Sequence, residues 1–250
     1  MLFDIATSIL SSTARGWRGT NAVIRTKQPE EFLVLYDMEG CPYCRPVRET
    51  LTELDLNVLI KPCPNGQAGH WAEVEQLSGQ RKVPCLLEPN SGQWHSGSEE
   101  IISFLYANYG AKAVKRHRTK PSLSKVATGM RGLRGLHGIT AKCPEQALVL
   151  YSFESSPFSR LVRERLTELG LPYMLYNAGK QQLADQGLSW LRPALGEYKP
   201  VPGSNREKLL TEAGKVQIPY LFDPNTGKRL FESRDIIKYL DSTYRETKTP

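Results

Sequence analysis

The residues best suited to chemistry are two cysteines in the motif Cys-Pro-Tyr-Cys at positions 41–44. The motif follows an apolar run of strand composition and opens a segment whose apolar residues have helical spacing, so we expect it at a helix N-terminus. The unpaired N–H groups and the positive dipole end of a helix favour thiolate over thiol. We therefore predict that Cys41 is a nucleophile, helped by the charges of Arg45 and Arg48. Cys44 then displaces the mixed disulfide that Cys41 forms.

A structural zinc site is the main alternative for two cysteines at this spacing. Zinc needs two further ligands, and the sequence has no second Cys-x-x-Cys and no paired histidines. We therefore favour redox chemistry and expect no metal. Among the other cysteines, Cys63 is either a redox accessory or a packed apolar residue, with packing favoured. Cys85 is expected in the core, and Cys143 has no evident role.

Cysteine usage also bears on the compartment. Five cysteines form an odd and sparse set, unlike a secreted disulfide framework, so we expect a reducing, cytoplasmic location. An organellar presequence is the alternative for residues 1–28, which are rich in Ser and Thr and carry four basic residues and one acid. No apolar run approaches the roughly 18 residues that a membrane-spanning helix needs.

The elements that must position the cysteines occur twice. Residues 36–56 match residues 151–171 at an offset of 115, with 12 of 21 positions identical. Residues 83–109 match residues 218–244 at an offset of 135, with 10 of 27 identical, so about 20 extra residues lie in the second copy around 187–210. Arg-Gly-x-Arg-Gly at 15–19 recurs at 131–135, and we interpret it as a helix-ending turn. Because this leading segment is duplicated together with its domain, we interpret it as part of the fold rather than as a cleaved leader.

Each copy predicts the same order of elements. Strands are expected at 32–36 and 147–153, helices at 42–54 and 157–169, and second strands at 58–61 and 173–176. A hairpin with a Pro-Asn-x-Gly turn follows in each copy. A closing helix then begins after an N-cap residue, Ser98 or Ser233.

These motifs stand in the order of a known family. The Cys-Pro-Tyr-Cys motif and Gly-Gln-Arg-Lys-Val-Pro at 79–84 resemble the glutaredoxins and the related N-terminal domain of glutathione transferases. The resemblance implies an α/β fold of two tandem thioredoxin-like (glutaredoxin-type) βαβ-ββα domains, each with a mixed sheet flanked by helices. We assign residues 1–110 to the first domain with its N-terminal extension, 111–125 to a basic linker and 126–250 to the second domain.

The resemblance also implies a glutathione site in the first copy. In the family, the residue before a cis-proline pairs with the glutathione backbone, and a Ser-acid pair at the last helix holds the γ-glutamyl carboxylate. A helix N-terminus is a prepared receptor for such a carboxylate. We therefore expect a glutathione-linked thiol-disulfide oxidoreductase, with glutathione as co-substrate and a disulfide-containing small molecule or protein as partner. The residues that match the family's binding positions are Tyr43, Arg81, Lys82, Val83, Pro84, Ser98 and Glu99.

The second copy departs from the family pattern. It reads Ser-Pro-Phe-Ser at 156–159, so thiol exchange is impossible there. A second glutathione site remains open, because the copy keeps Ser156, Ile218, Pro219, Glu232 and Ser233. The alternatives to the oxidoreductase are a non-catalytic glutathione- or partner-binding scaffold, and a transferase or isomerase in which Ser156 activates glutathione. The segment after Gly110 is too short for the family's helical domain, which counts against a conventional transferase.

The basic character of the chain is local. The net charge is +7, and residues 111–142 carry nine Lys or Arg and no acid. A solvated linker is the favoured interpretation, and an anionic membrane surface is the weaker alternative as a partner. Nucleic acid is not expected, because no aromatic residues interleave with the basic ones.

Overall fold

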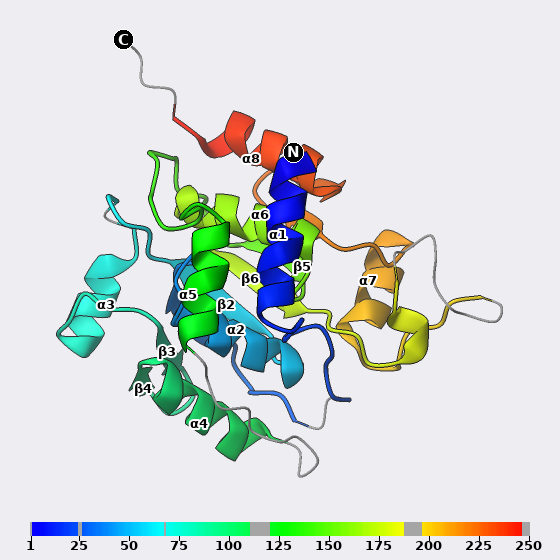
Figure 1. Ribbon diagram of the computed structural model, residues 1–250, viewed down its shortest axis with the longest axis horizontal. Helices are drawn as coiled ribbons and strands as arrows, with labels where there is room; N and C mark the ends of the chain where they lie inside the picture. Colours follow the sequence, from blue (N-terminus) through cyan, green and yellow to red (C-terminus); the bar gives the residue numbers. More distant parts are fainter. Residues whose placement is uncertain (1, 25–26, 68, 111–120, 188–196, 247–250) are drawn as a thin grey trace.

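One eight-stranded mixed sheet runs through both copies of the repeat (Figure 1). The computed structural model describes residues 2–24, 27–67, 69–110, 121–187 and 197–246. The strand order is β4-β3-β1-β2-β6-β5-β7-β8. The strands are β1 (Leu33–Asp37), β2 (Val58–Pro62), β3 (Cys85–Glu88), β4 (Gln93–Ser96), β5 (Leu148–Ser152), β6 (Tyr173–Asn177), β7 (Tyr220–Asp223) and β8 (Lys228–Phe231).

The two copies join through the antiparallel pair β2 and β6. Leu59 lies opposite Met174, and these two residues are equivalent positions of the repeat, 115 residues apart. An approximate two-fold axis therefore passes through this pair. Within each copy the first two strands are parallel and the hairpin strands are antiparallel, as the repeat predicts.

Helices cover both faces of the sheet. One face carries a single apolar core shared by the two copies, with α2, α4, α6 and α8 packed on alternate strand residues such as Leu33 and Leu35. The other face has two separate clusters, one under α3 and one under α7. The helices are α1 (Leu2–Ala14), α2 (Cys44–Glu53), α3 (Trp71–Ser78), α4 (Ser98–Tyr109), α5 (Pro121–Met130), α6 (Pro157–Glu168), the short 3₁₀ helix η1 (Leu183–Asp185), α7 (Asn205–Ala213) and α8 (Ser233–Tyr244).

The predicted fold class is confirmed, with local differences. Ser98 and Ser233 are the first residues of their helices and not the N-caps; the caps are Gly97, with φ 86°, and Glu232, with φ 65°. The turn from the hairpin into the helix needs a left-handed residue at the cap, which suits glycine and leaves serine one position later. Residues 121–125, assigned to the linker, lie in α5, and residues 111–120 of that linker lie outside the described residues.

The leading segments form a third layer. The helices α1 and α5 lie side by side in front of α2 and α6 (Figure 1). They run antiparallel, since Asp4 near the start of α1 pairs with Arg134 just after α5 at 2.5 Å. The Arg-Gly-x-Arg-Gly turns follow both helices, as predicted, and their first arginines pair with the helices below. The Arg15–Glu49 distance is 2.7 Å and the Arg131–Glu164 distance is 2.6 Å.

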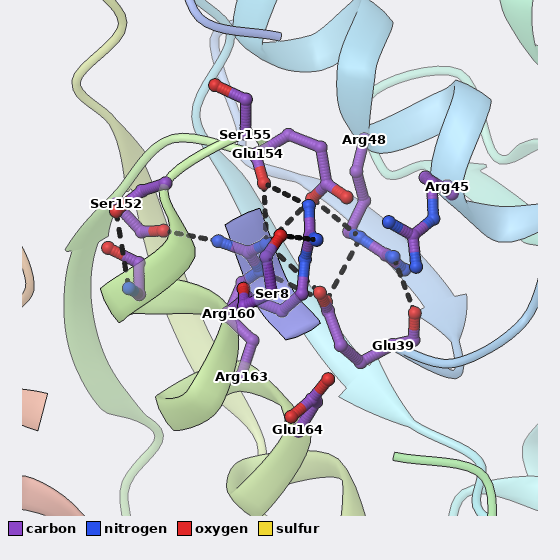
Figure 2. A network of polar contacts seen from close by, with 12 residues as sticks. Ser8, Glu39, Arg45, Arg48, Ser152, Glu154, Ser155, Arg160, Arg163 and Glu164 are labelled. Atoms are coloured by element: carbon purple, nitrogen blue, oxygen red, sulfur yellow. Dashed lines mark hydrogen bonds and ion pairs between the residues drawn. The ribbon is translucent and has the colours of Figure 1, made fainter. Parts of the chain in front are cut away.

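A buried cluster of charges lies between α2 and α6 (Figure 2). Two ion pairs cross between the copies: Arg48 Nε lies 3.0 Å from Glu154 Oε2, and Arg163 Nη2 lies 3.0 Å from Glu39 Oε1. Such pairs stabilise only when hydrogen bonds satisfy the groups that burial removes from water. The members, all at most 3% exposed, are Asp37, Glu39, Arg45, Arg48, Glu154, Arg160 and Arg163.

Candidate active site

The Cys41 sulfur has the surroundings of a stabilised thiolate. It lies in the loop between β1 and α2, just before the first helical turn. A hydrogen bond from the Cys44 thiol, and then the backbone N–H groups of Cys44 and Tyr43 and the charge of Arg48, hold the pKa of Cys41 at about 7, against its ordinary 9.0. The predicted role of the helix N-terminus and of Arg48 in lowering this pKa agrees with the structure. Arg45 instead donates from Nη1 to Ser11 Oγ at 3.1 Å.

Cys44 has the opposite character. It is fully buried, and burial together with its hydrogen bond to Cys41 and the nearby Asp37 raises its pKa well above the ordinary value. One thiol of the pair therefore ionises near neutral pH while the other keeps its proton. This difference suits an attacking thiolate and a reserve thiol.

The proline that follows the cysteines has the expected geometry. The Val83–Pro84 peptide bond is cis, and so is Ile218–Pro219 in the second copy. Val83 belongs to the same apolar cluster as Cys41 and Cys44. The N–H of Gly97 donates to the Pro84 carbonyl at 2.9 Å, which ties the start of α4 to this peptide.

The remaining predicted binding residues differ in their availability. Tyr43 is 46% exposed, and Lys125 Nζ lies 6.0 Å from the centre of its ring. Lys82 and Glu99 are exposed and Ser98 is half-buried. Arg81 is engaged on the surface: its Nη1 donates to Glu75 Oε1 at 3.1 Å, and its guanidinium stacks over a neighbouring tryptophan.

The loop that carries Cys41 is held from below by the charge cluster. Arg48 Nη2 donates to the Glu39 carbonyl at 2.8 Å (Figure 2). Arg48 Nη1 donates to the Met38 carbonyl at 3.2 Å. Arg163 in turn holds the Glu39 side chain from the second copy. The position of the thiolate thus depends on α6, although α6 carries no thiol.

From the sequence we expect Cys41 to lie in a cleft open to a tripeptide, and the redox interpretation depends on that access. The structure contradicts the expectation, because Cys41 is only 6% exposed. The segment after α5 packs over its loop. The N–H of Gly40 donates to the Gly135 carbonyl at 3.1 Å, and Thr128 Oγ1 donates to the Gly40 carbonyl at 2.8 Å. Leu136 packs against the apolar cluster that contains Cys41. A Cβ at position 40 would lie 2.7 Å from Leu136 Cγ, so only glycine fits there.

The equivalent place in the second copy is a cavity of about 420 Å³. That volume lies within the range of small-molecule sites, about 300–1,000 Å³. Four residues predicted for a second glutathione site line it: Ser156, Ile218, Pro219 and Glu232. Ser233 is buried at the start of α8. The Ser156 side chain is 2% exposed and caps α6 by accepting from the Ser159 N–H at 3.2 Å.

The two leading segments differ at the residue that follows the Arg-Gly-x-Arg-Gly turn. Thr20 lines the cavity in the second copy, and its repeat equivalent is Leu136 in the first. The leading segment clamps the loop in the same way in both: the Ser155 N–H donates to the Gly19 carbonyl at 3.2 Å.

Several residues that line this cavity were not predicted from the sequence. Trp17 comes from the leading segment, and Lys180 and Arg206 flank the inserted residues of the second copy. Arg206 is 4% exposed and donates from Nε to the Ala178 carbonyl at 3.1 Å. The insertion near 187–210 was a signal for extra residues in this region of the second copy. Residues 188–196 of it lie outside the described residues.

The other cysteines are not placed for exchange. Cys63 and Cys85 are buried in the cluster under α3, and burial raises the pKa of both thiols. Cys143 is exposed, and its Sγ lies 3.6 Å from the Pro144 carbonyl. Within the described ranges, no group of three or more His, Cys, Asp or Glu side chains is arranged to hold a metal ion. No helix of the same ranges is long and apolar enough to span a bilayer.

Comparison with known proteins identifies the repeated unit. The family described as "Glutathione S-transferase, N-terminal domain" matches residues 35–113 and again residues 150–248. No curated protein and no solved structure matches the chain. The two matched stretches cover both copies of the repeat and both cis-prolines.

Proposed function

Because the chain belongs to the glutathione S-transferase N-terminal domain family, we propose that it is a glutathione-linked thiol-disulfide oxidoreductase acting through Cys41. The observation that carries the proposal is the placement of the two thiols: Cys41 lies just before α2, hydrogen-bonded to Cys44 and in one apolar cluster with Val83. This arrangement lowers the pKa of Cys41 and raises that of Cys44. The fold of this family binds glutathione beside a cis-proline, and the Val83–Pro84 peptide bond of this chain is cis.

The reaction proceeds by two displacements at sulfur. The Cys41 thiolate attacks a disulfide, forms a mixed disulfide and releases one thiolate, which takes a proton from water. Cys44 then loses its proton, attacks Cys41 Sγ and releases the second substrate thiol. The substrate gains two electrons and two protons, and the Cys41–Cys44 disulfide holds the oxidising equivalent. Two molecules of glutathione return the dithiol and leave as glutathione disulfide.

The surrounding residues bind the tripeptide. The backbone of Val83 pairs with the cysteinyl part of glutathione, while Ser98 and Glu99 at the N-terminus of α4 receive its γ-glutamyl end. Lys82 and Tyr43 are exposed beside the loop and offer a charge and a ring. Turnover requires the Leu136 segment to move away from the Cys41 loop, because the sulfur is covered in the structure.

A coupled reduction assay tests the proposal. Reduction of hydroxyethyl disulfide by glutathione is followed through NADPH and glutathione reductase, for the unaltered chain and for Cys41→Ser. Cys143→Ser is the matched control, because that cysteine is exposed and distant in sequence from the motif. We expect Cys41→Ser to lose activity and Cys143→Ser to keep it. Full activity in Cys41→Ser refutes the assignment.

A second function is favoured by the cavity in the second copy: binding of glutathione without thiol exchange. The cavity of about 420 Å³ is lined by residues at the family's binding positions, with Lys180 and Arg206 as nearby positive charges. Calorimetric titration of glutathione into the Cys41→Ser/Cys44→Ser double variant isolates this site. We expect binding that Thr20→Leu weakens, because Thr20 lines the cavity and a larger side chain there would occupy part of it. A double variant that binds no glutathione refutes the second function.

The same cavity allows a test of the transferase alternative. If Ser156 activates the glutathione thiol, Ser156→Ala lowers conjugation of an electrophile such as chlorodinitrobenzene. The Ser156 hydroxyl already caps α6, so helix stability is measured alongside by thermal unfolding. Equal conjugation by Ser156→Ala and the unaltered chain, or none by either, rejects this chemistry.

A further inference from the structure

The leading helix α1 has its amphipathic pattern reversed. A helix on a globular protein usually turns its apolar stripe to the core and its polar face to water. The face of α1 that lies against the protein instead carries three buried serines, Ser8, Ser11 and Ser12. Its outer face carries Leu2, Phe3, Ile9 and Leu10, with Leu2 86% and Phe3 76% exposed.

The second leading helix repeats this reversal. Helix α5 buries Ser124 and Thr128, and it exposes Leu123, Val126 and Met130 by 40–49%. The turns after the two helices add Trp17 and Leu133, both at positive φ and both more than 40% exposed. The reversed pattern is therefore a property of the repeated segment and occurs on both sides of the two-fold axis.

The charge cluster explains the polar inner face of α1. Ser12 Oγ accepts from Arg160 Nη2 at 3.0 Å and Ser11 Oγ accepts from Arg45 Nη1 at 3.1 Å. Hydroxyl groups are needed there because the guanidinium groups are buried and must be hydrogen-bonded. Nothing inside the fold requires apolar residues on the opposite face.

The two outer faces form one surface. The helices lie side by side and antiparallel (Figure 1). Both bury hydroxyl side chains and expose large apolar ones. Nine of the fourteen exposed large apolar side chains among the described residues lie on these helices and their turns. An apolar surface gathered in this way marks an interaction site. We call it the α1–α5 face, made of Leu2, Phe3, Ile9, Leu10, Trp17, Leu123, Val126, Met130 and Leu133.

The charges near the α1–α5 face favour an anionic partner. Residues 2–24 and 121–142 contain six Lys or Arg and a single acid, Asp4. Four of the six are in ion pairs, those of Arg15, Arg18, Arg131 and Arg134, and the exposed lysines Lys125 and Lys142 remain as positive charges in these segments. A second copy of the chain would bring two basic surfaces together. An apolar helical face bordered by basic residues is the pattern of helices that lie in the interface of an anionic bilayer.

We propose that the α1–α5 face docks the protein onto anionic lipid membranes as a peripheral protein. The apolar side chains enter the boundary between headgroups and acyl chains, and the basic residues meet the lipid phosphates and carboxylates. Trp17 belongs both to this face and to the lining of the second-copy cavity, so the cavity opens next to the membrane. The proposal does not depend on the thiol chemistry.

Vesicle flotation tests the proposal. The full chain is mixed with vesicles of phosphatidylcholine alone, or of phosphatidylcholine and phosphatidylserine in equal parts, at low and high salt. We expect binding to the anionic vesicles only, and weaker binding at high salt because screening reduces the attraction.

Matched variants locate the surface. Phe3→Ser with Leu10→Ser removes two exposed apolar side chains of the face, and we expect at least about a tenfold loss of partitioning. Leu77→Ser with Leu183→Ser is the control, because these leucines are equally exposed, at 46% and 81%, but lie on α3 and η1. Circular dichroism checks that both variants are folded.

Three results would overturn the proposal. The first is no binding to anionic vesicles, and the second is equal binding by the two double variants. The third is sedimentation of the unaltered chain as a dimer that Phe3→Ser with Leu10→Ser dissociates, since the face would then join two copies.

Discussion

Replacing Glu39 by Gln tests how strongly the buried charges hold the two copies together. Glu39 lies in the first copy, and its two carboxylate oxygens accept from Arg163 Nη2 and Nε of the second, each at 3.0 Å. Its Oε2 also lies 3.2 Å from Arg48 Nε. Gln keeps the size of the side chain and one oxygen, so the change removes charge with little change of volume.

The expected loss follows from the balance of the cluster. Four buried guanidinium groups face three carboxylates, those of Asp37, Glu39 and Glu154, and the substitution leaves two. Removing one partner of a buried ion pair costs about 3–5 kcal/mol, because the other charge stays buried without compensation. Folded proteins are stable by only about 5–15 kcal/mol, so Glu39→Gln is expected to remove a large part of the free energy of unfolding.

Urea unfolding followed by far-ultraviolet circular dichroism measures this loss. Glu75→Gln is the matched control, because Glu75 pairs with Arg81 at 3.1 Å and both side chains are about half exposed. Exposed pairs contribute about 0–1 kcal/mol. The reasoning is refuted if Glu39→Gln loses less than about 1 kcal/mol, or no more than Glu75→Gln.

Three further predictions concern the thiol, its cover and acid. The rate of Cys41 alkylation by iodoacetamide, followed by mass spectrometry, is expected to have its pH midpoint near 7, and Cys44→Ala should raise that midpoint. If the pKa of Cys41 returned to 9.0, the thiolate fraction at pH 7 would fall about 50-fold. An unchanged midpoint contradicts the role of the Cys44 hydrogen bond. Leu136→Thr, which copies Thr20, should speed this alkylation without moving the midpoint, and an unchanged rate shows that Leu136 is not the cover. Burial raises the pKa of Glu154, but the surrounding arginines outweigh burial and hold this pKa at about 2, below the ordinary 4.5. The Glu154 carboxylate therefore contributes its full stability above pH 4.5, and this contribution is lost as the pH falls towards 2. That contribution is about 3 kcal/mol, and urea unfolding at pH 7 and pH 3 should show a smaller difference in Glu154→Gln.

Much of the fold could be predicted because the repeat supplies two independent views of each element. The two matching blocks fixed the strand and helix order, and the structure differs by one or two residues at most ends. The chemistry of the 41–44 motif was predictable for a local reason: the groups that lower the pKa of Cys41 lie within seven residues of it. The predicted start of α4 differs from the observed start by one residue, because the sequence does not reveal that Gly97 adopts a positive φ.

The cover over Cys41 could not be predicted, because it comes from far along the chain. Leu136 lies 95 residues after Cys41, in a segment whose pattern indicated only a turn. Arg45 and Arg48 were predicted only to add positive charge near the Cys41 thiol, and their burial, at 1% exposed each, was not predicted. Their partners are supplied by Ser11 in α1 and Glu154 in the second copy, and no local pattern connects these positions.

Each copy is completed by the segment that leads into the other. The turn after α5 introduces the second copy but covers the Cys41 loop of the first, and the turn after α1 introduces the first copy but lines the cavity of the second. Strand β2 gains its second neighbour only from β6. The second copy can therefore lose its thiols and still be required for the first, because Arg163 and Gly135 hold the loop on which the Cys41 thiolate depends.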